Sequence, residues 1–305
     1  KKVSFCHFNP VANNILGTCS YDHTVKVWDI EKQAEILSMD KHPDAIQSFA
    51  WNVNGSRLAT TCKDKVVRVY DPRQSDSVLS APAFEGGKPA RVVWMDNHQK
   101  LGCVGFSKTS MRQYAIYDPK MMDKPLAVSD IDQSAGVMMP FYDPDNSILY
   151  VGGKGDGNVR YFEVVNEAPY IYFLSEFRSS ESQKGLAFMP KVSVDVHKCE
   201  IARALRLMKD YVQPVSFQVP RKSDLFQEDI YPETYAGAPA LDADAWVEGK
   251  DADPILRSMK PGAASETAKI EFKAKKSRAE LETELQTANA RIAELEAELA
   301  KLKAQ

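Results

Sequence analysis

The sequence has no apolar run that approaches the roughly 18 residues needed to cross a bilayer as a helix. It therefore predicts no transmembrane segment. A strong charge of either sign is also absent, because 39 Lys and Arg stand against 42 Asp and Glu, for a net charge of −3. This balance argues against a nucleic-acid-binding protein. Hydrophobic residues make up 44% of the 305 residues, which is enough for a sizeable core and excludes global disorder.

Paired cysteines of the kind that bind metal or cycle between redox states are missing. The five cysteines form no CxxC pair. Cys6 lies beside His7, but no second ligand pair follows at a suitable spacing. We therefore expect no metal site. Cys19, Cys62 and Cys103 lie in apolar, strand-like runs, and we interpret them as small buried residues of a protein in a reducing cytosol.

The sequence also lacks a recognisable catalytic group. It contains no nucleophile elbow, no zinc ligand set and no paired carboxylates. The segment GGKGDGN (152–158) includes a GxG pattern, but no crossover helix follows it, so a hairpin turn is favoured over a phosphate-binding loop. We expect neither an enzyme nor a bound cofactor.

A repeat runs through the first half of the chain. The segments VKVWD, VVRVYD and QYAIYD end in an aromatic residue and an aspartate at 28–29, 70–71 and 117–118, with spacings of 42 and 47 residues. A fourth copy, GNVRYFEV (157–164), places its aromatic pair after a further 44 residues. Each copy follows a run that ends in a tight polar turn, as short antiparallel strands do. The period matches a four-stranded propeller blade of about 40–45 residues.

Two units carry polar residues at the offsets of the WD-repeat hydrogen-bond network. The residues are His42, Thr60, Asp64 and Tyr70 in the second unit and Thr18, Asp22 and Trp28 in the first. Such groups hydrogen-bond between strands, because buried polar atoms need partners. Tyr70 stands where Trp is usual, and a phenol cannot aim its donor as an indole does, so we expect an incomplete network there. No nucleophile lies beside His42 and Asp64, which argues against a catalytic dyad.

The four repeats and an irregular stretch at 168–219 predict about five blades of an all-β WD40 β-propeller over residues 1–220. An open propeller of five blades would expose strand edges, which proteins avoid. The chain also begins inside a strand-like segment, KKVSFCHF. We therefore expect two or so further blades upstream of Lys1.

The periodicity stops at residues 221–262. This segment contains Phe226, Tyr231, Tyr235 and Trp246, and a free linker rarely contains four large aromatic residues. We expect an irregular C-terminal arm that packs along the propeller through these rings, with a linker at its end.

Residues 263–305 contain neither Gly nor Pro and predict one long helix. Its apolar residues recur at steps of four and three, the heptad pattern of a coiled coil. They are Leu281, Leu285, Ala288, Ile292, Leu295, Leu299 and Leu302. Because an isolated helix would leave this stripe in water, it should oligomerise. In a parallel alignment Arg291 meets Glu296 of the next chain, while the core residues leave dimer, trimer and tetramer open.

Four long strings carry a resemblance to a known family. They are GFSKTS (105–110), PFYDPDNSILYVGGKGDGNVRYFE (140–163), PYIYFLSEF (169–177) and VPRKSDLFQEDIYPETYAG (219–237). In these strings, and over essentially the whole chain, the sequence resembles the coronins, which are WD-repeat actin-binding proteins. In the tail, RIAELE (291–296) is similar to an element linked to short parallel trimeric coiled coils in this family.

The resemblance implies a seven-bladed propeller, an arm that stabilises it, a linker and a coiled coil that favours a parallel trimer. It implies binding to filamentous actin and, in many members, contact with the Arp2/3 complex through the C-terminal region. The implied location is the cytoplasm, at the actin cytoskeleton and cell cortex. Several weakly binding propellers joined by one coil would gain avidity, which predicts cross-linking or bundling of filaments.

Actin filaments are acidic, so basic residues on exposed turns are the candidates for contact. They are Lys63, Lys65, Lys108, Arg112, Lys154 and Arg160. Alternatively, each of these six residues is simply a charged side chain that is solvated on its turn and contacts no partner. Because propellers host many partners, the alternative function is a WD40 scaffold or adaptor in membrane trafficking or ubiquitination, without direct actin binding.

Overall fold

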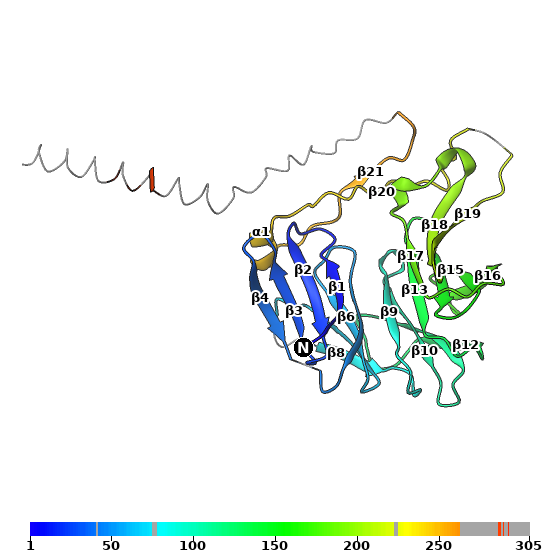
Figure 1. Cartoon of the computed structure of the whole chain (residues 1–305), viewed down its shortest axis with the longest axis horizontal. Helices are drawn as coiled ribbons and strands as arrows, with labels where there is room; N and C mark the ends of the chain where they lie inside the picture. The colour runs from blue at the N-terminus through cyan, green and yellow to red at the C-terminus, as the bar shows by residue number, and fades with distance from the viewer. Residues whose placement is uncertain are drawn as a thin grey trace, which may run out of the picture. The chain divides into compact units, whose positions relative to one another are not determined.

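The computed structural model describes residues 1–40, 42–74, 78–222 and 225–262, together with residues 286, 287, 289 and 292. Residues Lys1–Glu266 form one compact unit, and every element named below belongs to it. In its described part, five antiparallel sheets follow one another along the chain, four of four strands and one of three, and a two-stranded sheet follows them; Figure 1 shows their arrangement. The predicted all-β propeller of about five blades is confirmed.

The blades have the following strands. The first contains β1 (Val3–Phe8), β2 (Ile15–Ser20), β3 (Val25–Asp29) and β4 (Ala34–Met39). The second contains β5 (Ile46–Trp51), β6 (Leu58–Cys62), β7 (Val66–Tyr70) and β8 (Val78–Pro82). The third contains β9 (Arg91–Met95), β10 (Lys100–Phe106), β11 (Arg112–Tyr117) and β12 (Ala127–Asp132), with a 3₁₀ turn, η1 (Asp96–His98).

The last two blades differ in strand number. The fourth contains β13 (Met138–Asp143), β14 (Ile148–Gly153), β15 (Asn158–Val164) and β16 (Ile171–Arg178). The fifth contains only β17 (Gly185–Phe188), β18 (Glu200–Leu207) and β19 (Val212–Gln218), with the 3₁₀ turns η2 (Lys191–Ser193) and η3 (Val196–Lys198). The segment PYIYFLSEF, which we grouped with the fifth blade, instead forms β16 and pairs with β15.

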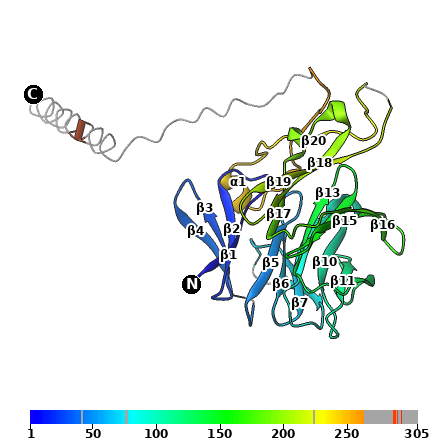
Figure 2. The ribbon, with the colours of Figure 1, turned by 45° about the vertical axis from the view of Figure 1, so that its right-hand side comes forward.

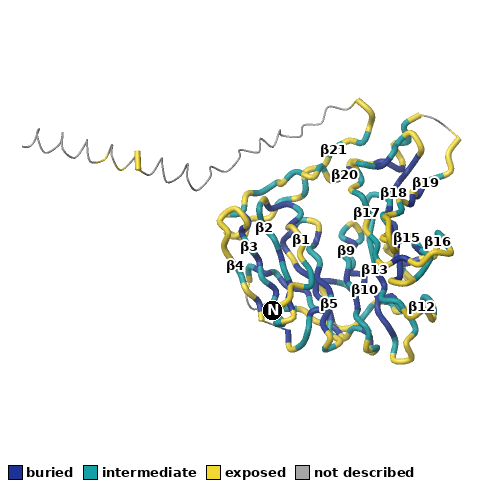
Figure 3. Tube along the Cα trace, viewed as in Figure 1, coloured by how far each residue is buried: buried dark blue, intermediate teal, exposed yellow. Residues whose placement is uncertain are grey.

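The cores lie between neighbouring sheets. The second and fourth sheets have a neighbouring blade on each side, and their second strands, β6 and β14, are buried along their whole length. Between the fourth and fifth blades the rings of Tyr150 and Phe217 lie 4.8 Å apart, centroid to centroid. Figure 3 shows the buried positions inside the sheets and the exposed positions in the connecting turns. Face-to-face packing of successive sheets therefore explains why the strands are apolar on both sides.

The antiparallel meander of each blade defines two faces. Turns between first and second strands lie at one end, which we call the arm face. Turns between second and third strands lie at the other end, which we call the hairpin face and which comprises 21–24, 63–65, 107–111, 154–157 and 208–211. The connections between blades also lie on the hairpin face, because each fourth strand runs in the direction of the second.

Residues 225–262 form the arm, which returns from the fifth blade to the first (Figure 2). Its elements are β20 (Thr234–Tyr235), which pairs with β21 (Leu256–Arg257), and the short helix α1 (Ala243–Val247). Leu241 forms a parallel bridge with Ala12, in the turn between β1 and β2. No helix in the ranges given above is long and apolar enough to cross a membrane.

Candidate functional site

In the first blade the polar network joins two of its three predicted members. The indole Nε1 of Trp28 donates a 2.8 Å hydrogen bond to the Thr18 hydroxyl on the neighbouring strand. Asp22 stays in its own turn, where its carboxylate accepts a 2.6 Å hydrogen bond from the Thr24 hydroxyl. That bond lowers the pKa of Asp22 to about 2, so the aspartate is ionised and ties the turn together.

In the second blade the network is divided. His42 Nε2 lies 2.8 Å from the Thr60 hydroxyl, whereas Asp64 pairs with Arg68. The Nδ1 atom of His42 and the hydroxyl of Tyr70 are buried and have no hydrogen-bond partner among the described residues. Burial lowers the pKa of His42 to about 4, so its ring is neutral. His42 and Asp64 thus act in separate contacts.

The hairpin face carries four of the predicted basic residues on exposed turns. Lys63 lies 3.7 Å from the carboxylate of Asp44, with its side chain 64% exposed. Lys65 donates a 2.7 Å hydrogen bond to the backbone carbonyl of Glu85. The ammonium groups of Lys63 and Lys65 therefore already have partners within the protein.

Lys108 and Lys154 are exposed in the equivalent turns of the third and fourth blades. Neither ammonium group has a hydrogen-bond or ion-pair partner within the described ranges. Their charges are therefore available to an acidic partner.

Arg112 and Arg160 do not lie on exposed turns, so their prediction as turn residues is wrong. The Arg112 side chain is 3% exposed and binds Asp132 and Asp156 at 2.6 and 2.5 Å. Arg160 lies on β15 and pairs with Asp132 and Glu176. Both guanidinium groups join the third and fourth blades, because carboxylates from strands and turns of both blades converge on them.

Sequence reasoning missed two lysines on the hairpin face. Lys184 precedes β17 and Lys209 lies in the turn between β18 and β19, and both are exposed. The fifth blade lacks the aromatic signature near the end of the third strand that marks the other four repeats, so its turn was not compared with theirs. An alignment of the turns between second and third strands would have placed Lys209 at a position equivalent to Lys108 and Lys154.

The arm face is occupied by the arm, which is anchored at both ends. Near the fifth blade the Tyr231 hydroxyl donates a 2.9 Å hydrogen bond to the carbonyl of Glu200. Near the first blade the Tyr235 hydroxyl donates a 2.6 Å hydrogen bond to the carbonyl of Pro10. Aromatic rings thus attach the arm to blades at opposite ends of the described chain.

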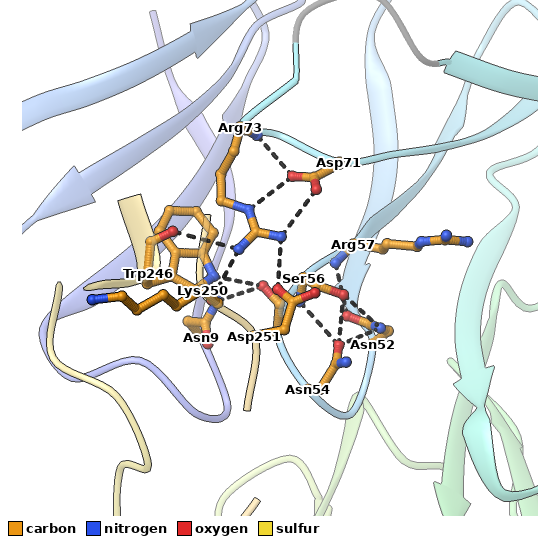
Figure 4. Close-up of polar contacts among 11 residues, drawn as sticks. Asn9, Asn52, Asn54, Ser56, Arg57, Asp71, Arg73, Trp246, Lys250 and Asp251 are labelled. Atoms are coloured by element: carbon orange, nitrogen blue, oxygen red, sulfur yellow. Dashed lines mark hydrogen bonds and ion pairs between the residues drawn. The ribbon is translucent and has the colours of Figure 1, made fainter. Parts of the chain in front are cut away.

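The strongest anchor is Trp246 on α1, shown in Figure 4. It is fully buried in the core between the first and second blades, where its ring contacts Trp51 edge to face at 5.8 Å. Its indole N–H donates a 2.9 Å hydrogen bond to the carbonyl of Gly55. Gly55 has φ +64°, and a Cβ there would lie 2.1 Å from the Asn9 amide oxygen, so only glycine fits this turn.

Arg73 packs against the Trp246 ring. Its guanidinium lies 5.3 Å from the centre of the Trp246 ring and binds Asp71 and Asp251 at 2.9 and 2.8 Å. It also donates a 3.2 Å hydrogen bond to the Lys250 carbonyl. The side chain is 7% exposed, so these carboxylates compensate a nearly buried charge.

The described residues contain no group of three His, Cys, Asp or Glu side chains that could hold a metal ion. All five cysteines are free thiols; Cys19, Cys62 and Cys103 are buried as predicted, Cys199 is buried as well, and Cys6 is exposed. Burial raises the pKa of Cys19 to about 11, which makes it unreactive.

Most of the predicted oligomerisation residues, from Leu281 to Leu302, lie outside the described residues. Of that set only Ile292 is described; it is helical and 53% exposed. The coiled coil stays a prediction.

Comparison with known families identifies the repeats. A family described as "WD domain, G-beta repeat" matches residues 1–29 and 33–71. A family described as "Type of WD40 repeat" matches residues 212–254. These matches cover the first blade, the second blade without β8, and β19 with much of the arm.

Two curated relatives share most of the chain. Coronin-A of Dictyostelium discoideum is 46% identical over 273 residues, which cover 87% of this chain and 61% of that protein. Coronin-2A of Homo sapiens is 42% identical over 269 residues, which cover 86% of this chain and 51% of that protein. The chain thus spans between 51% and 61% of the length of these relatives.

Solved structures agree. The WD40 domain of Toxoplasma gondii coronin superposes with a TM-score of 0.81 at 34% identity, covering 86% of this chain and 68% of that chain. A chain of the mitotic checkpoint complex superposes with a TM-score of 0.57 at 13% identity, covering 71% of this chain and 64% of that one. The second likeness shows the propeller fold alone. The likeness to the Toxoplasma gondii coronin structure, together with the two curated relatives, shows that this chain belongs to the coronin family.

Proposed function

We propose that this chain binds filamentous actin through the lysines of its hairpin face and regulates the organisation of filaments. The observation that carries the proposal is the row of exposed lysines on equivalent turns, of which Lys108 and Lys154 have free ammonium groups. An acidic filament attracts such charges and orients the approaching protein. The arm covers the opposite face, so the hairpin face is the accessible one in the described part of the chain.

Charge reversal on matched turns tests this surface. Lys63→Glu with Lys108→Glu removes two hairpin-face cations, whereas Lys120→Glu removes an exposed cation at the other end of β11. Exposed ion pairs contribute about 0.2–1 kcal/mol each, so the double variant should bind filaments roughly twofold to thirtyfold more weakly in co-sedimentation. The control should bind as the parent does. Equal weakening by Lys120→Glu would refute a specific face.

The second half of the proposal concerns the tail. We propose a division into a propeller at 1–220, an extension and linker at 221–262 and an oligomerising coiled coil at 263–305. A parallel trimer, paired through Arg291 and Glu296, would hold several propellers on one filament and raise their effective concentration. Contact with the Arp2/3 complex and residence at the cell cortex belong to the same proposal.

Removal of the tail tests avidity. A chain that ends at Gly262 should keep the propeller contact but lose bundling, measured by low-speed sedimentation of filaments. Native mass measurement of the 305-residue chain should give three subunits, and Arg291→Ala should lower that number or the temperature at which the trimer dissociates. Equal bundling with and without the tail would refute the mechanism, and a pull-down without actin would favour the adaptor function.

A further inference from the structure

A polar pocket of about 420 Å³ interrupts the cover that the arm gives to the arm face, at the junction of the second and third blades. Turns of both blades and the end of the arm contribute to it. Its lining includes Asn54, Arg57, Asp96, Lys120 and, from the arm, Asp251. Figure 4 shows Asn54, Arg57 and Asp251. The volume lies within the range of about 300–1,000 Å³ that is typical of binding sites.

Asp96 is the carboxylate that joins the two blades at this pocket. It begins η1, directly after β9, and its Oδ2 atom accepts a 2.9 Å hydrogen bond from the backbone N–H of Val53 in the second blade. This bond fixes the carboxylate at the junction that the pocket occupies. The other oxygen, Oδ1, has no hydrogen-bond or ion-pair partner within the described ranges and is not sealed from solvent. A ligand in the pocket can therefore reach it.

The negative charge of Asp96 is uncompensated. Burial raises the pKa of this carboxyl to about 6, because the group loses water without gaining a cation. The other two carboxylates of the lining differ, since Asp71 and Asp251 bind the Arg73 guanidinium at 2.9 and 2.8 Å. An unpaired charge that is held in a pocket at a cost in stability is typical of a functional site.

Two cationic side chains also line the pocket, but neither pairs with Asp96. Arg57 is exposed and its guanidinium has no partner in the part of the chain that the structure describes; Figure 4 shows it extending away from Asp251. Lys120 donates a 2.8 Å hydrogen bond to the side-chain oxygen of Gln99. The lining therefore carries an open carboxylate together with separate positive charges.

Trp94 and Pro119 add carbon surface to the lining. The indole N–H of Trp94 already donates a 3.0 Å hydrogen bond to the carbonyl of Ala50. What Trp94 offers a ligand is therefore its ring, against which the aliphatic stem of a long basic side chain can pack.

From this arrangement we infer that the pocket binds a segment of a partner protein that inserts one arginine side chain and carries an acidic residue beside it. The guanidinium pairs with the open oxygen of Asp96, because its planar fork suits a carboxylate. The acidic neighbour faces the positive charges of Arg57 and Lys120. The pocket and the hairpin-face lysines lie on opposite faces, so this inference does not rest on the binding of filaments.

Isothermal titration of the 305-residue chain with the peptide acetyl-Gly-Glu-Arg-Gly-amide tests the pocket. We expect saturable binding to one site per chain. Because one charged contact and one packed stem carry the affinity, the Kd should be on the order of 1 mM. The same peptide with glutamine in place of arginine should bind at least about tenfold more weakly, since it lacks the cation.

Asp96→Asn is the decisive variant, because asparagine keeps the shape of the side chain and an oxygen for the Val53 hydrogen bond but lacks the charge. It should stay folded and bind the peptide at least about tenfold more weakly. Asp123→Asn is the matched control. It removes an exposed carboxylate from the turn between β11 and β12, on the same face but outside the lining, and should bind within about twofold of the parent.

Arg57→Gln tests the acidic neighbour. It should weaken the glutamate peptide about twofold to fivefold, as expected for an exposed ion pair, and should leave unchanged the binding of a peptide with glutamine in place of glutamate. An equal effect on both peptides would overturn the assignment of the acidic residue.

Three outcomes would overturn the inference as a whole. They are the absence of saturable binding, undiminished binding by Asp96→Asn, and equal weakening by Asp123→Asn. Binding of free arginine as tight as that of the peptide would identify a small-molecule site and overturn the assignment to a protein segment.

Discussion

Replacement of Trp246 by alanine should destabilise the propeller and not merely release the arm. Trp246 is fully buried in the core that joins the first and second blades. A buried tryptophan covers about 150–250 Å², and at about 25 cal/mol per Å² this area contributes about 4–6 kcal/mol, an upper value. Large-to-small changes of this kind cost about 3–5 kcal/mol in practice.

Two polar contacts are lost together with the ring and form part of this observed cost. The indole N–H hydrogen bond to the carbonyl of Gly55 contributes about 1 kcal/mol, and the Arg73 guanidinium above the ring contributes about 1 kcal/mol more. We therefore expect Trp246→Ala to lower the free energy of unfolding by about 4 kcal/mol. At about 2 °C per kcal/mol for a unit of this size, the melting temperature should fall by about 8 °C.

The assay is urea unfolding at pH 7 followed by circular dichroism, with calorimetry for the melting temperature. Trp246→Phe is the matched control, because it keeps an aromatic ring and removes the N–H donor, and it should cost about 1–2 kcal/mol. A change below about 1 kcal/mol in the alanine variant would refute the reasoning. The reasoning would also be refuted if the arm were cleaved faster by a protease while the unfolding transition of the propeller stayed unchanged. The arm would then be independent of the stability of the propeller.

Three further predictions concern buried charges. Arg112→Ala leaves Asp132 and Asp156 without their shared cation and should cost about 3–5 kcal/mol in urea unfolding; a neutral effect would contradict the ion cluster. The pKa of His42 is about 4 in the folded chain, below its ordinary 6.5, so its contribution to stability, up to about 3 kcal/mol, is present above pH 6.5 and lost as the pH falls to 4. His42→Gln should remove that slope in unfolding measured against pH. Burial raises the pKa of Asp96 to about 6, so its charge lowers stability as the pH rises from about 4 to 6. Asp96→Asn should thus stabilise the chain by about 1–3 kcal/mol at pH 7 and by little at pH 4, and an equal gain at both pH values would contradict this account.

Several features could be predicted from local pattern. The third strand of each of the first four blades carries an aromatic residue, at Trp28, Tyr70, Tyr117 and Tyr161, and Tyr70 and Tyr117 are buried in the cores between blades. The spacing of these residues therefore predicted the blades. The β16 segment was placed in the wrong blade because its turn after β15 resembles a blade boundary, and only its pairing with β15 decides the matter.

Contacts between distant segments were not predictable in the same way. The aromatic residues of the arm predicted that it packs on the propeller, but not that Trp246 meets Gly55, which is 191 residues away. The docking site depends on a glycine turn and on the Arg73 cluster. These features come together only when the first and second blades are packed.

By itself the sequence determined the all-β architecture, the number of blades and the turns that carry lysine, since strand alternation and turn chemistry act over a few residues. Only the tertiary structure decided which basic side chains are accessible. Arg112 and Lys108 lie four positions apart, yet the first is buried because carboxylates 20 and 44 residues further along the chain converge on it. Arg206 is also buried, but it donates to the side-chain amides of Gln183 and Gln213 instead of to carboxylates.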